Sequence, residues 1–193
     1  MRSAFAALSL LFVAVPVRAT VLIGADLGEL TRDARAIVRG RVVAVDAQWT
    51  TDRRAIETLV TLEVERYLKG ALGETVQFRV PGGAFGRFRS IVVGAPTFAV
   101  DDRVVVFLGA RGPSVPYVVG FSQGVFRIAR SGDGSTWLVT PAALLPSASG
   151  NVTVIRGDPA RRPQPLNEFE EKVRALAGGA RGGPMAGVAA GRL

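Results

Sequence analysis

The sequence predicts a mainly β protein, an antiparallel barrel or sandwich with a short helix near each end. Apolar and polar residues alternate over many short segments, and glycine and proline separate these segments from one another. The helical spacing of apolar residues is confined to two stretches. The chain has 193 residues, 48% of them hydrophobic and 21% charged, which is the size and composition of one globular domain.

The two helical stretches lie near the ends of the chain. Residues 27–34 follow Asp26, a typical N-cap, and Glu29 completes a capping box with it. Residues 168–177 follow Asn167, which we expect to cap that helix in the same way, with Glu170 in the capping-box position. Three apolar residues of the second helix share one stripe: Phe169, Val173 and Leu176. This stripe predicts that the second helix packs against the β domain.

Short β segments fill the chain between these helices. The clearest is 56–65, where apolar residues and threonine alternate with residues that include three glutamates. This period of two places one face on a core and the other largely in water. The continuous apolar run 104–108 is typical of a strand covered on both faces. Further strands are expected at 37–45, 76–80, 90–93, 117–119, 125–129, 136–139 and 152–155, and the glycine-rich residues 82–86 are expected to form a flexible loop.

Residues 1–19 have the order of a secretory signal peptide. Arg2 precedes an apolar run from Ala4 to Val15, and small residues lead to a cleavage site after Ala19. The run has about twelve residues, whereas a helix that spans a bilayer needs roughly twenty. We therefore expect a cleaved signal peptide and a periplasmic or secreted protein that begins at Thr20.

The rest of the chain is expected to divide into three parts. Residues 20–146 would form the β domain, and residues 147–177 a loop and the C-terminal helix packed on it. Residues 178–193 are rich in glycine and too poor in apolar residues to offset their ordering entropy, so this tail is expected to be disordered. The chain contains no cysteine, so an exported fold would be held by its buried core without disulfides.

The absence of histidine and cysteine narrows the possible chemistry, because these residues supply the commonest general base, metal ligands and thiol nucleophile. Residues 120–124 match the G-x-S-x-G motif around Ser122. A nucleophile elbow needs a helix after the serine, but a strand is expected at 125–129, and there is no histidine to act as base. We expect no enzymatic activity, no cofactor and no bound metal. The disfavoured alternative is a serine hydrolase in which Lys69 or Lys172 would form a Ser-Lys dyad with Ser122.

The carboxylates are expected to have structural roles. Glu57, Glu63 and Glu65 share the polar face of their strand, where pairing with arginines across strands is the usual role. Asp101 and Asp102 occupy a predicted turn, where aspartate is favoured for its hydrogen bonds to the backbone.

The formal charge is +8, and 22 of the 24 basic residues are arginines, since only Lys69 and Lys172 are lysines. The arginines are scattered along the chain, so we expect no specific binding of nucleic acid. Removal of Arg2 and Arg18 with the signal peptide would leave +6. Electrostatic binding to polyanions at the cell surface remains an alternative, which a steep dependence on salt would reveal.

The segment around residues 82–89 is the first candidate for a contact surface. Phe85 and Phe88 lie on this glycine-rich connection beside Arg87 and Arg89, and aromatic residues and arginine are enriched at protein interfaces. These four residues are the predicted binding site. The alternative, which the usual burial of phenylalanine favours, is that both rings are buried and close one end of the barrel.

Three segments carry a resemblance to known proteins: 36–42 (AIVRGRV), 61–70 (TLEVERYLKG) and 102–108 (DRVVVFL). In their order they resemble a group of uncharacterised exported bacterial proteins. More distantly, residues 33–130 are similar to the netrin-like module of tissue inhibitors of metalloproteinases, which implies an OB-like barrel. Those inhibitors place an N-terminal cysteine on the protease zinc, so their inhibitory residues do not carry over to this cysteine-free chain. The resemblance implies the barrel architecture alone. OB-type barrels commonly bind across one strand face and its neighbouring loops, and by this analogy we expect a non-enzymatic module that binds a protein or an envelope component.

Overall fold

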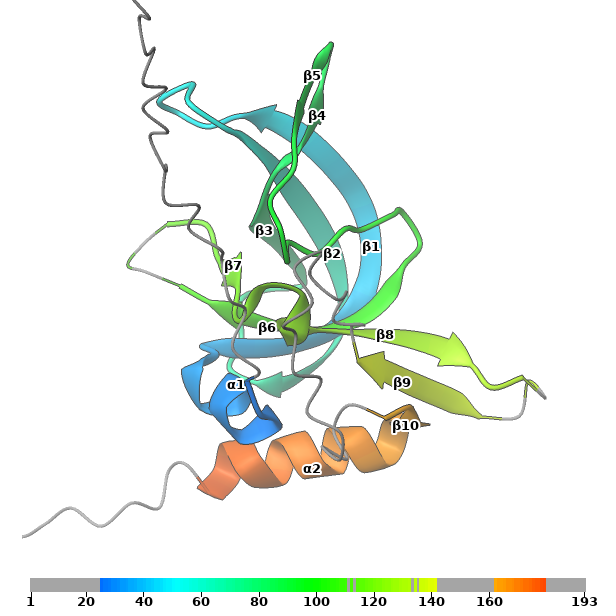
Figure 1. Ribbon diagram of the computed structural model, residues 1–193. Helices are drawn as coiled ribbons and strands as arrows, with labels where there is room; N and C mark the ends of the chain where they lie inside the picture. The colour runs from blue at the N-terminus through cyan, green and yellow to red at the C-terminus, as the bar shows by residue number, and fades with distance from the viewer. Residues whose placement is uncertain are drawn as a thin grey trace, which may run out of the picture.

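A computed structural model describes residues 25–110, 112, 114–132, 134, 136–141 and 162–179. This part of the chain is mainly β, with a short helix before the strands and a longer one after them (Figure 1). The predicted signal peptide, the expected strand at 152–155 and residues 180–193 of the predicted tail lie outside the described residues.

Helix α1 (Leu27–Asp33) begins as the sequence predicts. The Asp26 side chain accepts a hydrogen bond from the Glu29 backbone N–H at 2.7 Å, and the Glu29 side chain accepts one from the Asp26 N–H at 3.1 Å. Both halves of the capping box are therefore present. Leu27 and Leu30 are buried, so one face of this short helix packs on the core.

The main sheet has eight strands. Their bounds are β1 (Ala36–Trp49), β2 (Ile56–Lys69), β3 (Thr75–Pro81), β6 (Arg103–Gly109), β7 (Tyr117–Val118), β8 (Val125–Arg130), β9 (Trp137–Pro141) and β10 (Gln164–Pro165). Neighbours follow the order β1-β2-β3-β7-β6-β8-β9-β10. Because β1 also pairs with β6, the strands β1, β2, β3, β7 and β6 form a partial ring.

The sheet is mixed, so the prediction of a purely antiparallel sheet is wrong at one pairing. β3 and β7 run parallel and meet at a single residue pair, Arg79 with Tyr117. The other pairings of the main sheet are antiparallel. Strand pairing between segments far apart in the sequence leaves no local pattern, which is why the direction of β7 relative to β3 could not be predicted.

The continuous apolar run of the sequence forms strand β6. Its residues from Val104 to Leu108 are fully buried, which confirms a strand covered on both faces. Val105 and Phe107 belong to a cluster with residues of α1, β8, β9 and the C-terminal helix. The alternate residues belong to a second cluster inside the partial ring: Val104, Val106 and Leu108. The period of two thus sends alternate side chains of β6 into two different cores.

Strand β2 confirms the predicted alternation over most of its length. Ile56, Val60 and Leu62 are buried, whereas Glu63 and Glu65 are exposed. Its pairing with β1 contains several register shifts. Such irregularities change which side chains face the core, and they account for the departure from strict alternation near the end of the strand.

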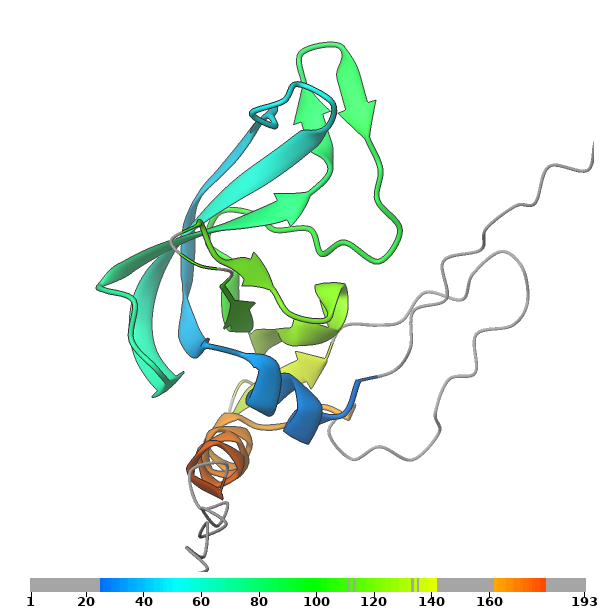
Figure 2. The same ribbon diagram turned by 90° about the vertical axis from the view of Figure 1, so that its left-hand side faces the viewer.

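Helix α2 (Leu166–Gly179) covers one side of the sheet and contacts α1, β2, β9 and β10. It begins before Asn167, so the prediction of Asn167 as its N-cap is wrong. Phe169 and Val173 are fully buried, as the stripe predicts, while Leu176 remains 37% exposed. The helix also includes Gly178 and Gly179, which the sequence assigned to the disordered tail. Figures 1 and 2 both show α1 and α2 at one end of the molecule.

A separate two-stranded sheet stands where we expected a flexible loop and a strand at 90–93. It consists of β4 (Gly83–Phe85) and β5 (Phe88–Ser90). Gly86 and Arg87 connect them; φ of Gly86 is +58°, and Arg87 has no positive φ. A glycine at the first of two turn positions is typical of a type II′ hairpin turn. Strands of three residues are too short for a period of two to be recognised in the sequence.

Candidate functional site

The β4–β5 hairpin projects at the end of the molecule opposite α2 (Figures 1 and 2). We call this projection the arm and define it as residues 82–93 together with the β1–β2 connection, residues 49–55. Two hydrogen bonds hold its base on β2: the Gly82 N–H donates to the Ile56 carbonyl at 2.9 Å, and the Thr58 hydroxyl donates to the Gly82 carbonyl at 2.7 Å.

Gly83 fixes the base of the arm more tightly than another residue would allow. Its φ is +141°, and a Cβ atom at this position would lie 2.5 Å from Oγ1 of Thr58. Both the backbone conformation and the available space therefore require glycine. The first strand of the hairpin, β4, contacts both β1 and β2.

The arm carries an exposed aromatic face. Phe85 and Phe88 are paired residues of the two short strands, so their side chains lie on the same side of the hairpin. They are 44% and 47% exposed, respectively. Phe88 also contacts Trp49 at the end of β1, with 5.4 Å between ring centroids. The alternative that both rings close the core is therefore wrong, because neither belongs to a buried cluster.

The charge of the arm is positive. The Arg87 guanidinium lies 5.1 Å from the centroid of the Phe88 ring, and Arg89 is exposed. The sequence from residue 82 to residue 100 contains no acidic residue. Ile91 and Val93, which follow the hairpin, are each 76% exposed. The structure thus brings the four predicted site residues together on one projection and adds Trp49, Ile91 and Val93, which the sequence analysis did not select.

The β1–β2 connection adds two more arginines and one carboxylate to the arm. Arg53 and Arg54 are exposed, and the Arg54 guanidinium lies 3.9 Å from the Asp52 carboxylate. Hydrogen bonds from the Thr50 hydroxyl and the Arg54 backbone N–H hold the pKa of Asp52 below its ordinary value. Asp52 is therefore ionised at neutral pH and organises its own turn.

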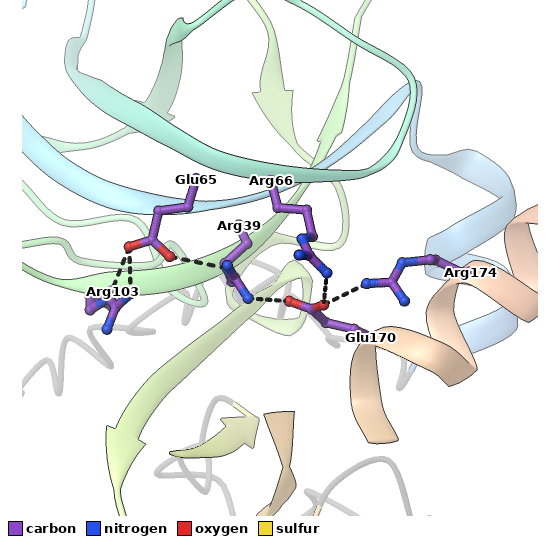
Figure 3. A network of polar contacts seen from close by, with 6 residues as sticks. All are labelled: Arg39, Glu65, Arg66, Arg103, Glu170 and Arg174. Carbon is purple, nitrogen blue, oxygen red and sulfur yellow. Dashed lines mark hydrogen bonds and ion pairs between the residues drawn. The ribbon is translucent and has the colours of Figure 1, made fainter. Parts of the chain in front are cut away.

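A second polar cluster lies at the other end of the molecule, where α2 meets the sheet (Figure 3). The Glu170 carboxylate is only 5% exposed and contacts three guanidinium groups, at 2.6 Å from Arg39, 3.3 Å from Arg66 and 2.6 Å from Arg174. Arg39 comes from β1, Arg66 from β2 and Arg174 from the next turn of α2. The cluster therefore ties α2 to two strands of the partial ring.

The network continues through Glu65, which lies 3.0 Å from Nε of Arg39 and 2.7 Å from Nη2 of Arg103. Two other glutamates of β2 also contact arginines of neighbouring strands: Glu63 contacts Arg41 at 2.7 Å, and Glu57 contacts Arg79 at 3.7 Å. The predicted cross-strand pairing of all three glutamates with arginines is confirmed. Glu170 was assigned only to a capping box, because sequence spacing does not show which strands a helix will cover.

An open hollow adjoins this network. Its volume is about 390 Å³, and it is lined by Arg39, Arg66, Thr136, Trp137, Leu166, Asn167 and Glu170. The Trp137 ring lies 4.6 Å from the Arg103 guanidinium and 4.3 Å from that of Arg130. Cations at such distances interact favourably with an indole ring, so Trp137 interacts with two guanidinium groups beside the hollow.

The G-x-S-x-G segment has a different environment from a nucleophile elbow. Ser122 lies in a short 3-10 helix, η1 (Phe121–Gly124), that leads directly into β8. Its backbone N–H donates to the Gly94 carbonyl at 2.9 Å. The predicted strand after the motif is confirmed.

The two lysines considered as partners for Ser122 have other surroundings. Lys69 Nζ donates to the carbonyls of Thr31 at 2.6 Å and Arg32 at 3.1 Å. These carbonyls lie in the last turn of α1, where a cation is stabilising. Lys172 lies on an exposed part of α2. Lys69 therefore caps the C-terminal end of a helix.

Over the described ranges of the chain, no three acidic side chains are grouped so that they could hold a metal ion. In the same ranges no helix has both the length and the apolar character needed to cross a membrane. The sequence matches no protein-family model and no curated protein.

Proposed function

We propose that this protein is an exported, non-enzymatic binding module that recognises a protein partner through the arm. The observation that supports this function is the exposure of Phe85, Phe88, Ile91 and Val93 on one projection, between 44% and 76% for each side chain. Neighbouring apolar side chains exposed in this way mark interaction surfaces on soluble proteins. The proposed export rests on the signal-peptide pattern of residues 1–19.

The pairing order of the partial ring supports an OB-like barrel as the finer description of the fold. Five strands follow one another as β1-β2-β3-β7-β6 and return to β1, and OB folds are five-stranded, partly open barrels. Such folds bind ligands on the face of the second and third strands and on the loop between the first two strands. In this protein the β1–β2 connection forms part of the arm. We propose on this basis the distant relationship to the netrin-like module.

The chemistry of the arm supports a partner with a complementary surface. Its exposed rings, its four arginines (Arg53, Arg54, Arg87 and Arg89) and its single carboxylate, Asp52, have the composition of a protein-interface core, in which aromatic residues and arginine are enriched and acidic residues are depleted. A complementary partner would offer an apolar depression bordered by carboxylates. Opposite charges at the border would speed association and select the partner.

The proposed function is tested by capture from the exported fraction with residues 20–193 as bait. A photo-crosslinking side chain at position 88 should form a covalent adduct with one protein, and the same group at position 176 should not. Leu176 is a suitable control because it is 37% exposed but lies on α2, at the opposite end of the molecule (Figure 1). A bait with Phe85→Ala and Phe88→Ala should lose the partner, while Leu176→Ala should retain it. Equal retention by the arm variant and the parent protein would overturn the proposal.

Polyanion binding and hydrolase activity, the two alternative functions, predict different experimental results. A polyanion ligand would be released steeply between low and physiological salt, because counterion release sets the slope, and its retention would not depend on Phe85 or Phe88. A hydrolase would turn over ester or peptide substrates, and Ser122→Ala would abolish that turnover. Either outcome would replace the binding-module proposal.

A further inference from the structure

The hollow beside α2 contains more positive charge than its carboxylates neutralise. The ion-pair network of Figure 3 has four arginines and two glutamates: Arg39, Arg66, Arg103, Arg174, Glu65 and Glu170. Four positive charges and two negative charges leave +2 within one connected cluster. This surplus lies beside the hollow, because Arg39, Arg66 and Glu170 also line it.

Attachment of α2 to the sheet does not by itself require this surplus. Phe169 and Val173 are fully buried under the helix, and Phe169 packs 4.7 Å from Phe126 between ring centroids. One guanidinium is enough to neutralise the buried Glu170 carboxylate. The second and third guanidinium groups repel the first one, and this repulsion lowers the benefit of the ion pairs.

The surplus charge is accessible from solvent. Arg39 is largely buried, but the Arg66 side chain is 53% exposed and meets Glu170 at the longest distance of the three, 3.3 Å. The hollow is open to solvent, and its volume of about 390 Å³ leaves room for a small anion. Two residues with polar side chains, Thr136 and Asn167, and the aromatic residue Trp137 also line it.

We propose that this hollow binds the carboxylate or phosphate group of a small anionic ligand, with the Arg66 guanidinium as its main contact. The planar fork of an arginine matches two oxygens of either group. Arg39 would add positive charge at the base of the hollow, and Asn167 a neutral hydrogen-bond donor. The Glu170 carboxylate contacts the same arginines and therefore competes with the ligand for them. This site is separate from the arm, and it does not depend on the function proposed for the arm.

The two tryptophans of the chain allow a direct measurement. Trp49 belongs to the arm and Trp137 lines the hollow, so Trp49→Phe leaves a single fluorescent reporter at the proposed site. This variant is titrated with inorganic phosphate and, separately, with citrate, at an ionic strength held constant with sodium chloride. We expect a saturable change of Trp137 fluorescence, and the relative affinities of the two anions distinguish a phosphate site from a carboxylate site.

Three substitutions in this background test the assignment of the contacts. Arg66→Ala should weaken binding about tenfold, because a hydrogen bond to a charged group is lost. Arg54→Ala removes an arginine whose side chain is 87% exposed at the opposite end of the molecule, and it should leave the affinity unchanged. Glu170→Gln should tighten binding severalfold, because it removes the competing carboxylate while keeping its shape.

Circular dichroism and urea denaturation confirm that each variant is folded before it is titrated. If Glu170→Gln is unfolded, the comparison of Arg66→Ala with Arg54→Ala still decides the proposal. The absence of a saturable change with both anions would overturn it. An equal loss of affinity in Arg66→Ala and Arg54→Ala would also overturn it. The anion would then respond to the net charge of the protein and not to a contact with Arg66.

Discussion

The ring of Phe88 meets the ring of Trp49 edge to face, with 5.4 Å between centroids and an interplanar angle of 65°. One residue ends β1 and the other begins β5, so this contact connects the hairpin to the long β1–β2 pair. Phe88 remains exposed in spite of the contact. The pair therefore orders an aromatic surface without burying it, as a preorganised binding surface requires.

The first prediction concerns this contact. A double-mutant cycle with Trp49→Ala, Phe88→Ala and the double variant should give a coupling energy of about 0.5–1.5 kcal/mol, the usual value for an aromatic pair. Urea denaturation measures the three differences in unfolding free energy. Additive effects would show that the two rings do not stabilise each other.

The second prediction concerns the base of the arm. Gly83→Ala should destabilise the protein by about 1–3 kcal/mol, because alanine is strained at this positive φ and its methyl group would meet Thr58. Hydrogen exchange at residues 83–90 should rise by more than that of β6. Gly132→Ala is the control: no heavy atom lies within 4 Å of its Cβ position. Equal stability of the two variants would contradict the prediction.

The third prediction concerns the packing of α2. Phe169→Ala should cost about 3–5 kcal/mol, as for other buried aromatic residues, because Phe169 is fully buried against Phe126. Leu176→Ala on the same helix should cost much less, since Leu176 is partly exposed. Thermal and urea denaturation measure both values. A small effect of Phe169→Ala would mean that α2 contributes little to the core.

The fourth prediction concerns the pKa of Asp52. The Thr50 hydroxyl donates to the Asp52 carboxylate at 2.6 Å and is the main cause of its lowered pKa. Thr50→Val should therefore raise the pKa of Asp52 toward its ordinary value, and Thr50→Ser, which keeps a hydroxyl, should not. Carbon-detected NMR of the carboxyl group as a function of pH measures both values.

The sign of the accompanying stability change follows from proton linkage. The pKa of Asp52 is lower in the folded state than in the unfolded state, so its ionised form stabilises the fold above the unfolded-state pKa. This contribution is lost as the pH falls through the folded-state pKa. The pH-dependent part of the stability difference between the parent protein and Thr50→Val should consequently disappear in acid. A difference that grows in acid would contradict this assignment.

Several elements were predictable because their causes are local. The capping box of Asp26 and Glu29 depends on residues three apart, and the alternation of β2 depends on neighbours two apart. The hairpin of β4 and β5 was missed although its turn has a local cause, the positive φ of Gly86, because its strands are too short to show a period. The partial ring is completed by a single residue pair between β3 and β7. No pattern of neighbouring residues in the sequence predicts that pairing.

The candidate sites divide in the same way. Phe85, Arg87, Phe88 and Arg89 were identified from composition because they are close in the chain. Trp49 was not, since it reaches them only through the pairing of β1 with β2 and the position of the hairpin. The contact between Arg39 and Glu170 joins residues 131 positions apart, and glutamates on a helix surface usually face water. No sequence pattern distinguishes Glu170, which is buried among three arginines, from the exposed glutamates of the same helix.

The sequence by itself determined the mainly β character, the start of α1 and the two-sided burial of β6, because periodicity and capping are properties of neighbouring residues. Only the tertiary structure decided that the arm is exposed and that three guanidinium groups converge on Glu170. Exposure and ion pairing depend on which distant segments come together. That choice is made by the burial of apolar side chains over the whole chain, which the order of residues in one segment does not reveal.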